Sequence, residues 1–476
     1  GHGSLFQWIN AATTPMGRSA LKTMLIEPSK EIDLIRKRQD AIRELGREVD
    51  WRQRLEMEGS RKANRFTEPE KLIEWAETEP LFTPGAAAMV FYRILPFLTI
   101  GCLFFPSVTV RMIGGLLLFV HLAVLNLTGR KTNEVVERVA KNDEGLKTLG
   151  RLALVIEEGR PEAELLKETQ TRLTSAPGLT ASASIRKIAR IAGWMNVRHN
   201  KEVHTSLNFV FFWDVLFSVA AEKWRRKHGA HLRTWLETIG AFEAWSSLGT
   251  IHFEHPDWAF PVWSDDASSF SAETLGHPLI PDDTRICNDV DLSRDGGIVI
   301  ITGSNMTGKS TLLRAVGLNM VLAECGAPVC ASALSAFPFR VVTSMRAVDS
   351  LEMGRSTFYA ELLRIKMIIE AAKEKEPVLF LIDELFRGTN SRDQRDGTFA
   401  VLRSLDEQHA IGMVATHDVT IGRLEEEEPG QFKNVHFQER LEGIDLIFDY
   451  KIQPGISTTT NAIHLMKRLG IWPEKS

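Results

Sequence analysis

The strongest chemical signal in this sequence is a glycine loop, GSNMTGKS, which ends in a lysine and a serine. At this spacing, backbone N–H groups and the positive end of a following helix face phosphate oxygens. The lysine reaches the outer phosphates, and the serine hydroxyl ligates Mg²⁺. The pattern therefore predicts a site for a nucleoside triphosphate with Mg²⁺. The residues concerned are Gly303, Ser304, Asn305, Met306, Thr307, Gly308, Lys309, Ser310 and Thr311.

Two acids and a histidine lie at the ends of two further apolar runs. Asp383 and Glu384 end the run PVLFLIDE, and His417 lies near the end of IGMVATHD. Asp383 would hold Mg²⁺ through its water shell, and Glu384 would orient or deprotonate the attacking water. His417 would sense the γ-phosphate or hold that water. With Lys309 these are candidate catalytic residues for hydrolysis, although solvated acids and a structural histidine are the alternative interpretation.

The elements that must position these groups are visible in the same runs. Ile298–Thr302 (IVIIT) precedes the loop and predicts a strand, and the run TLLRAVGLNMVLA after it predicts a helix. The runs 377–384 and 411–418 are short and apolar, which predicts buried parallel strands. The motif therefore has the strand, loop and helix context that its chemistry requires.

A different signal is purely apolar. Ile94–Val110 and Met112–Leu127 carry almost no charge and are separated by Arg111, with basic residues outside both ends. Each run has about 16 or 17 residues, near the lower limit for crossing a hydrocarbon core of roughly 30 Å. Flanking basic residues suit a membrane hairpin whose termini are cytoplasmic. A buried helical pair or a dimer surface is the alternative interpretation.

The stretch from Ala181 to Arg233 is rich in basic residues, including Arg225, Arg226 and Lys227, and is interleaved with tryptophans. Such a surface could neutralise nucleic-acid phosphates or anionic lipid heads. A solvated helix face with core tryptophans fits as well. Inside this stretch, Asn208–Ala220 is apolar nearly all round and predicts a buried segment.

Three strings resemble the MutS family of ABC-type ATPases: TGSNMTGKST, STFYAEL and DELFRGTN. The resemblance implies ATP as the nucleotide and catalysis at composite sites in a homodimer. It also implies that Ser356, Thr357 and Phe358 form a signature loop that reaches the partner's γ-phosphate, whereas an ordinary helix N-cap is the alternative. Arg387 to Asn390 would form the loop after the second carboxylate.

The resemblance extends to both ends of the chain. Ser4–Leu45 is similar to the start of the MutS core, or lever, domain, and Gln453–Ile471 is similar to its C-terminal helical region. The strings HPLI and CND resemble the lead-in to the ATPase domain, where an aromatic residue commonly stacks on adenine. Arg285 stands at that place here, and its guanidinium could stack instead.

These observations predict an α + α/β fold: a helical lever domain over residues 1–260, and a P-loop ABC-type ATPase domain with a C-terminal helical dimerisation segment over residues 261–476. Residues 94–127 are the candidate transmembrane hairpin. The formal net charge of −4 over 476 residues excludes a polyelectrolyte. Four cysteines without zinc-type spacing predict reduced structural thiols.

The expected function is ATP hydrolysis coupled to lever motion and related to double-stranded DNA. Direct mismatch reading is not expected, because the sequence starts at the segment that resembles the lever; a mismatch-reading portion ahead of this sequence is the alternative. The alternative is a membrane-associated nucleotide switch without a DNA substrate. A nucleotide-gated scaffold with negligible turnover is a third option, which intact Asp383, Glu384 and His417 disfavour. The expected location is cytoplasmic, free or anchored to the cytoplasmic face of a membrane.

Overall fold

The computed structural model describes residues 3–61, 69–174, 180–292, 297–304, 307–345, 357–374, 376–386, 389–442 and 445–457. The chain divides into two compact units. An α/β unit combines Gly1–Ile9, Met24–Arg43 and Ile251–Ser476, and a helical unit combines Asn10–Thr23 and Glu44–Thr250. The predicted combination of a helical part and an α/β part is confirmed. The α/β unit also takes in two segments from the start of the chain.

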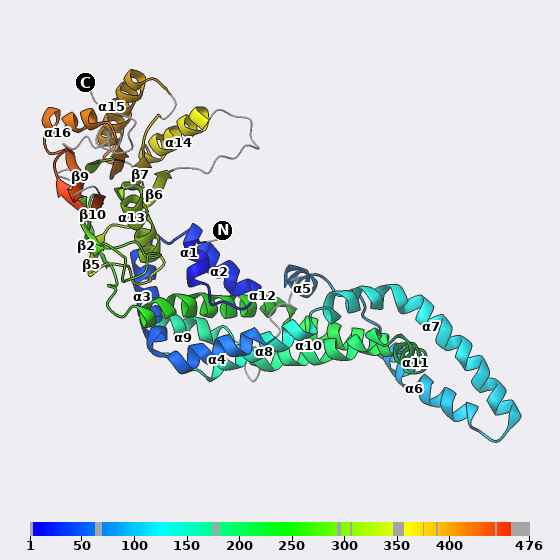
Figure 1. Ribbon diagram of the computed structural model, residues 1–476. Coiled ribbons are helices and arrows are strands. Elements are labelled where there is room, and N and C mark those ends of the chain that lie inside the picture. The colour runs from blue at the N-terminus through cyan, green and yellow to red at the C-terminus, as the bar shows by residue number, and fades with distance from the viewer. Residues whose placement is uncertain are drawn as a thin grey trace. The chain divides into compact units, whose positions relative to one another are not determined.

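A six-stranded sheet forms the centre of the α/β unit, in the order β10-β9-β4-β8-β7-β6. Figure 1 labels β6, β7, β9 and β10 of this sheet. All neighbours are parallel except β9 and β10, which form an antiparallel hairpin. Parallel order brings the carboxyl ends of β4, β7 and β8 to the same edge. The strands are β4 (Ile298–Thr302), β6 (Arg340–Ser344), β7 (Val378–Asp383), β8 (Ile411–Thr416), β9 (Phe432–Glu442) and β10 (Asp445–Pro454).

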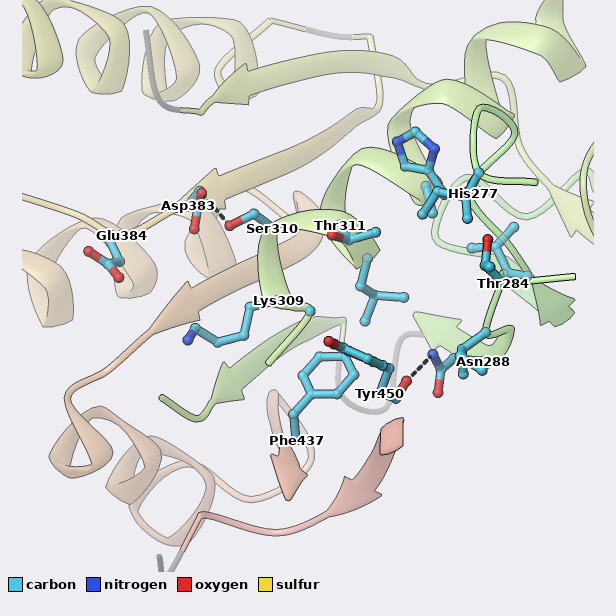
Figure 2. Close-up of a pocket in the computed structure, with 16 residues that line it drawn as sticks. His277, Thr284, Asn288, Lys309, Ser310, Thr311, Asp383, Glu384, Phe437 and Tyr450 are labelled. Atoms are coloured by element: carbon cyan, nitrogen blue, oxygen red, sulfur yellow. Dashed lines mark hydrogen bonds between the residues drawn. The ribbon is translucent and has the colours of Figure 1, made fainter. Parts of the chain in front are cut away.

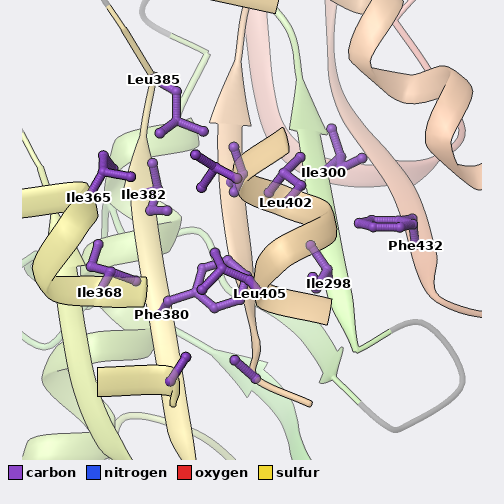
Figure 3. Close-up of a cluster of buried hydrophobic side chains, with 14 of the residues drawn as sticks. Ile298, Ile300, Ile365, Ile368, Phe380, Ile382, Leu385, Leu402, Leu405 and Phe432 are labelled. Atoms are coloured by element: carbon purple, nitrogen blue, oxygen red, sulfur yellow. The ribbon is translucent and has the colours of Figure 1, made fainter. Parts of the chain in front are cut away.

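The three middle strands β4, β7 and β8 are buried along their whole length, as expected for parallel strands covered on both faces. Apolar side chains from this sheet and from nearby helices form one core, in which Ile300, Phe380 and Leu402 are fully buried (Figure 3). Gly412 in β8 is required by this packing, because a Cβ there would lie 2.2 Å from the Phe380 carbonyl oxygen. The helices of this layer are α13 (Lys309–Glu324), α14 (Thr357–Ala372) and α15 (Ser391–Glu407).

A smaller four-stranded sheet, in the order β1-β5-β2-β3, completes the α/β unit. Burial alternates along β3, so one of its faces meets the core and the other meets solvent. This sheet and the turn that follows β2 supply one wall of the site described below. The remaining elements are α1 (Leu5–Ile9), α3 (Ile32–Arg47), β1 (Val262–Trp263), β2 (Phe270–Leu275), β3 (Asn288–Leu292), β5 (Ala333–Ala336), η4 (Val419–Arg423) and α16 (Leu424–Glu427).

A buried ion pair fixes the early segment of the chain to the end of helix α13. The Lys30 ammonium lies 2.6 Å from the Glu324 carboxylate and also donates to the Phe339 carbonyl. The Glu324 side chain is fully buried, and that burial outweighs the nearby Lys30 charge and raises the pKa of the carboxyl to about 7. One residue further along, the Cys325 thiol donates to the Met24 carbonyl.

The helical unit is built from long antiparallel helices, with α8 and α10 packed closely along their lengths (Figure 1). Buried Glu243 of α12 accepts from the Thr13 and Thr14 amides, at 2.9 and 3.1 Å, and so satisfies donors at the start of α2. Its helices are α2 (Pro15–Ile26), α4 (Val49–Ser60), α5 (Pro69–Glu77), α6 (Ala86–Leu103), α7 (Val108–Ala140), α8 (Asp143–Glu158), α9 (Glu164–Thr171), α10 (Ala181–Met195), η2 (Asn196–His199), α11 (Lys201–Phe211) and α12 (Trp213–Glu254).

Helices α6 and α7 form a hairpin over the predicted apolar runs (Figure 1). Its turn lies at residues 104–107, so Arg111, which divides the two runs in the sequence, lies inside α7 and not at the turn. Within the described residues, these two helices are long and apolar enough to cross a membrane, and the bent pair α11 and α12 meets the same criteria as a broken span. In the most apolar 18-residue stretch of each helix, only a minority of the residues is buried inside the protein. Exposed large apolar side chains include Ile94, Phe97, Leu98, Phe104, Val108, Met112, Leu116, Phe119, Leu122 and Leu127.

Candidate nucleotide-binding site

A cavity of about 690 Å³ opens in the α/β unit beside the start of α13 (Figure 2). It lies at the carboxyl ends of β4 and β7, the edge where open parallel sheets bind ligands. One end is polar and the other is lined by apolar and aromatic groups. The lining residues are Leu275, His277, Ile280, Thr284, Ile286, Asn288, Gly308, Lys309, Ser310, Thr311, Leu312, Ala315, Asp383, Glu384, Phe437 and Tyr450.

The glycine loop connects β4 to α13, as the sequence predicts. Gly303 and Gly308 have φ values of +148° and +108°, a region that glycine adopts without strain. Lys309 is buried, and its ammonium donates to the carbonyls of Gly303, at 2.8 Å, and Ser304. The loop is therefore shaped around the lysine. Asn305 and Met306, which the sequence also assigns to this loop, lie outside the described residues.

Ser310 and Asp383 meet across 73 positions of sequence, because α13 starts beside the end of β7. The Ser310 hydroxyl donates to the Asp383 carboxylate at 2.7 Å (Figure 2). Both groups present oxygen atoms, the ligands that Mg²⁺ prefers. The donor set at this point therefore fits the predicted ion, with Ser310 and Asp383 as the residues that would hold it directly or through water.

Glu384 follows Asp383 and occupies a strained backbone conformation, with φ at +60°. Its amide donates to the Ala415 carbonyl of β8 at 2.9 Å, which fixes the turn at the strand end. The carboxylate lies 3.7 Å from Nδ1 of His417, whose side chain is half exposed. The structure thus brings Lys309, Ser310, Asp383 and Glu384 to one cavity, and His417 lies beside Glu384.

Arg285 does not face the cavity. Its guanidinium donates to the carbonyls of His277, at 3.1 Å, and Ile280, at 2.9 Å, and pairs with Asp282 at 2.5 Å. It also lies over the Trp258 ring, 5.3 Å from the ring centroid. These contacts hold the turn that carries Thr284 and Ile286, so Arg285 shapes the wall from behind. Stacking of Arg285 on a base is not compatible with this placement.

Two aromatic side chains that the sequence analysis did not select line the cavity instead. Phe437 comes from β9 and Tyr450 from β10, and both stand beside the glycine loop (Figure 2). A Cβ on Gly308 would lie 3.2 Å from Cδ1 of Tyr450. The register of β9 and β10 shifts between Phe448 and Ile452, and Tyr450 has φ at +52° within that bulge. Bulges re-aim side chains in this way.

His277 lines the same cavity on the side of the small sheet. Burial, together with the charges of Arg314 and Arg285, lowers the pKa of its imidazole. The ring is therefore neutral near pH 7, since its ordinary pKa is about 6.5. Its Nδ1 accepts from the Leu279 amide at 3.2 Å.

The structure describes two of the three residues of the expected signature loop. Ser356 lies outside the described residues, Thr357 begins α14, and Phe358 packs against the core of the sheet. Of the loop after the second carboxylate, Arg387 and Gly388 lie outside the described residues, and the Asn390 side chain caps α15 by accepting from the Asp393 amide.

The basic residues of the helical unit separate into two groups. Arg225 is buried, pairs with Glu222 at 2.7 Å and donates to the Trp75 carbonyl at 2.9 Å. It therefore fastens α5 to α12 and presents no charge to a polyanion. Arg226 and Lys227 are exposed, so the candidate surface for nucleic acid or lipid keeps only these two of the three predicted residues.

The fold combines a helical unit with an α/β unit, and in the α/β unit a glycine loop, a lysine and the oxygen-bearing side chains of Ser310 and Asp383 line a cavity. Residues 299–475 match the family model for MutS domain V, and residues 1–70 match that for MutS domain III. The chain belongs to the MutS family.

Relatives named DNA mismatch repair protein MutS share sequence with this chain. That of Thermotoga sp. (strain RQ2) is 33% identical over 250 residues, which make up 52% of this chain and 31% of that protein. That of Methanosarcina acetivorans is 25% identical over 529 residues, covering 99% of this chain and 56% of that protein. The chain thus spans about half, or less, of the length of these relatives.

Proposed function

We propose that this chain binds ATP with Mg²⁺ and hydrolyses it in the cavity beside Lys309. The contact between Ser310 and Asp383 carries this proposal, because it pairs the hydroxyl of the glycine loop with the first of two strand-end carboxylates. Two acids that were merely solvated at a strand end would not be expected within hydrogen-bond distance of that hydroxyl. The proposal includes the P-loop ABC-type ATPase domain that the sequence predicts.

Each residue has a role that follows from its position. Bound Mg²⁺ would offset charge on the phosphate oxygens. Lys309 would exchange its contacts with the Gly303 and Ser304 carbonyls for phosphate oxygens, and Ser310 and Asp383 would hold the ion. Glu384 would accept a proton from the attacking water, or orient it, and His417 would support Glu384 from the solvent side.

The apolar end of the cavity would receive the adenine base. Ile280, Ile286 and Phe437 form its walls, and the Tyr450 ring offers a face for stacking. Tyr450 remains 42% exposed, so part of the ring is free to meet a ligand. Asn288 fixes this residue by donating to its carbonyl at 3.0 Å.

We further propose that two copies of the chain form the active dimer. In such a dimer the segment with Ser356, Thr357 and Phe358 would complete the site of the partner, and the C-terminal segment would support dimerisation. Mixing Lys309→Ala with Ser356→Ala chains tests this, because a mixed dimer would contain one intact composite site. Recovery of ATPase activity on mixing is expected, and no recovery in a proven mixed dimer would contradict composite sites.

The names of the relatives support a role linked to double-stranded DNA. We propose that lever motion, and not direct mismatch reading, connects ATP hydrolysis to this partner. The test is ATP turnover by the full chain with and without duplex DNA. Stimulation by duplex supports the DNA role, whereas identical turnover with and without DNA opposes it.

A second candidate function is a membrane-associated nucleotide switch without a DNA substrate, and the hairpin of α6 and α7 favours it. Phe97, Met112, Phe119 and Leu127 are each at least 70% exposed, more apolar surface than soluble proteins usually leave in one place. From Val108 to Leu127, α7 extends about 28 Å, close to a hydrocarbon core.

This candidate places the chain at the cytoplasmic face of a membrane, with residues 94–127 inserted. Flotation of the full chain with phosphatidylcholine vesicles tests it, and a variant in which a short polar linker replaces residues 94–127 is the control. Flotation only of the unaltered chain is expected. Equal recovery of both proteins in the soluble fraction would refute insertion.

A further inference from the structure

Helix α11 lies against the apolar hairpin and ends in an abrupt break. The chain bends by 80° between α11 and α12 at Phe212, whose φ of +54° is left-handed. Phe212 is fully buried and belongs to the same cluster as Leu95 of α6 and Val124 of α7. The break is therefore packed inside the hairpin base and is a fixed feature of the fold.

The C-terminal end of α11 lies beside the apolar part of the hairpin, which ends before the basic residues Arg130 and Lys131. Its Phe209 carbonyl meets His121, which lies six residues, or about 9 Å, closer to the hairpin tip than Leu127. The Phe211 ring lies 6.5 Å from the ring of Phe97, which is 70% exposed. The other end of α11 is polar, and Lys201 there is exposed. The apolar end of α11 therefore lies beside the apolar part of the hairpin, and its polar end is exposed to solvent.

A broken helix in hydrocarbon requires internal partners for its free backbone groups, because no water is present to satisfy them. Here two of the groups that the break opens have partners within the protein. His121 Nδ1 donates to the Phe209 carbonyl at 2.8 Å, since a carbonyl can only accept. On the other side of the break, the Asn208 side chain accepts from the Asp214 amide at 3.0 Å. The last carbonyls of α11 and the first amides of α12 are the groups that a break leaves open.

His121 itself is buried, and it connects all three helices. Its Nε2 lies 3.1 Å from the Thr99 hydroxyl of α6, which donates to the Leu95 carbonyl at 2.8 Å. The imidazole plane also lies against Phe212, with ring centroids 4.5 Å apart. A histidine in an apolar hairpin is costly unless it has such a task.

We propose that α11 and the break at Phe212 form a re-entrant element that enters the lipid beside the α6–α7 hairpin and leaves on the same side. His121 is the positioning residue that makes the broken backbone tolerable there. This inference rests on the proposed membrane insertion of the hairpin and extends it to a third element, whose partner is the acyl-chain region of the bilayer. Leu207, Val210 and Phe211, all partly exposed, would face the lipid.

Site-directed spin labelling of the full chain in phosphatidylcholine vesicles tests the element directly. Labels at Val210→Cys, Leu122→Cys and Lys201→Cys would report collisions with oxygen, which concentrates in lipid, and with a water-soluble nickel chelate. The background would carry Cys102→Ala and Cys287→Ala. Cys325 and Cys330 can remain, because they are buried and burial raises the pKa of each thiol to about 12.

The expected result is a lipid-type profile at Val210 and Leu122, with oxygen collisions dominant, and an aqueous profile at Lys201. An aqueous profile at Val210 with a lipid profile at Leu122 would overturn the re-entrant element and leave the hairpin intact. Aqueous profiles at both positions would instead refute membrane insertion as a whole. The two failures are therefore distinguishable.

Two further variants test the role of His121 with the Val210 label in place. His121→Leu removes the donor to the Phe209 carbonyl and should shift the Val210 label towards the aqueous profile, while Leu122 keeps its lipid profile. His121→Asn places an amide donor near the position of Nδ1 and should restore the original profile. Unchanged Val210 accessibility in His121→Leu would show that α11 does not depend on this contact.

Discussion

Replacing Tyr450 by alanine tests the least expected part of the site. The ring stands over Gly308 and lines the apolar end of the cavity, with 42% of the residue still exposed. If adenine stacks on this ring, its removal should cost about 1–3 kcal/mol, which raises the Kd for ATP about 5- to 150-fold. Tyr450→Phe should bind ATP nearly as the parent does, because stacking needs the ring and not the hydroxyl.

Isothermal titration calorimetry with ATP and with inorganic triphosphate separates base contacts from phosphate contacts. Only the ATP affinity should fall in Tyr450→Ala, since triphosphate has no base. Phe448→Ala is the matched control, because Phe448 lies on the same strand with its ring 5.9 Å from Tyr450 but does not line the cavity. An unchanged Kd for ATP in Tyr450→Ala, or an equal loss in Phe448→Ala, would refute the assignment of the base to this wall.

Three further predictions concern charged residues. Glu384→Gln should lower turnover by about 10²- to 10⁴-fold, as expected for loss of a general base, while ATP affinity by calorimetry stays the same; parent-level phosphate release would exclude Glu384 as the base. Lys309→Ala removes a charged donor worth about 1.5–3 kcal/mol, so the Kd for ATP should rise about 10- to 150-fold, and undiminished affinity would count against the glycine loop. Burial raises the pKa of Glu324 from 4.5 to about 7 in the folded protein. The contribution of this carboxyl to the unfolding free energy is therefore fully present below pH 4.5 and is lost as the pH rises through 7. The change amounts to at most about 3 kcal/mol. Denaturant unfolding should therefore show Glu324→Gln gaining stability relative to the parent between pH 5 and pH 8, and a difference that does not vary with pH would contradict the buried carboxyl.

The positions of the residues that we assign to the phosphates were predictable because their sequence signals are local. Asp383 is the last residue of a short apolar strand, and the glycine loop and His417 each follow directly after one, and parallel strands bring such ends to one edge. The aromatic wall that we assign to the base, with Phe437 and Tyr450, was not predictable in the same way. Tyr450, 140 positions after Ser310 of the loop, reaches the cavity through a register shift in a hairpin, and residue spacing does not encode that shift.

Charge clustering was a poor guide to exposure in α12. Arg225, Arg226 and Lys227 are identical in charge, but helical geometry turns only Arg225 inward, towards Trp75 and Glu222. The acid three positions earlier was the available signal, because residues at that spacing share a helix face. The apolar run Asn208–Ala220 predicted a buried segment, and this holds only in part: Phe212, Val215 and Val219 are buried, whereas residues 208–211 at the end of α11 are half-buried. The run also gave no sign of the break at Phe212.

The place of β4 in the large sheet has a consequence for shortened chains. This strand pairs with β8 on one side and with β9 on the other, and all of its residues are buried. A chain cut before Phe432 would strip one side of β4, leaving a flat apolar edge with open amides that invites intermolecular pairing. The hairpin of β9 and β10 thus protects the edge of β4 from intermolecular pairing, in addition to forming a wall of the pocket. Fragments that lack it should precipitate before their nucleotide affinity can be measured.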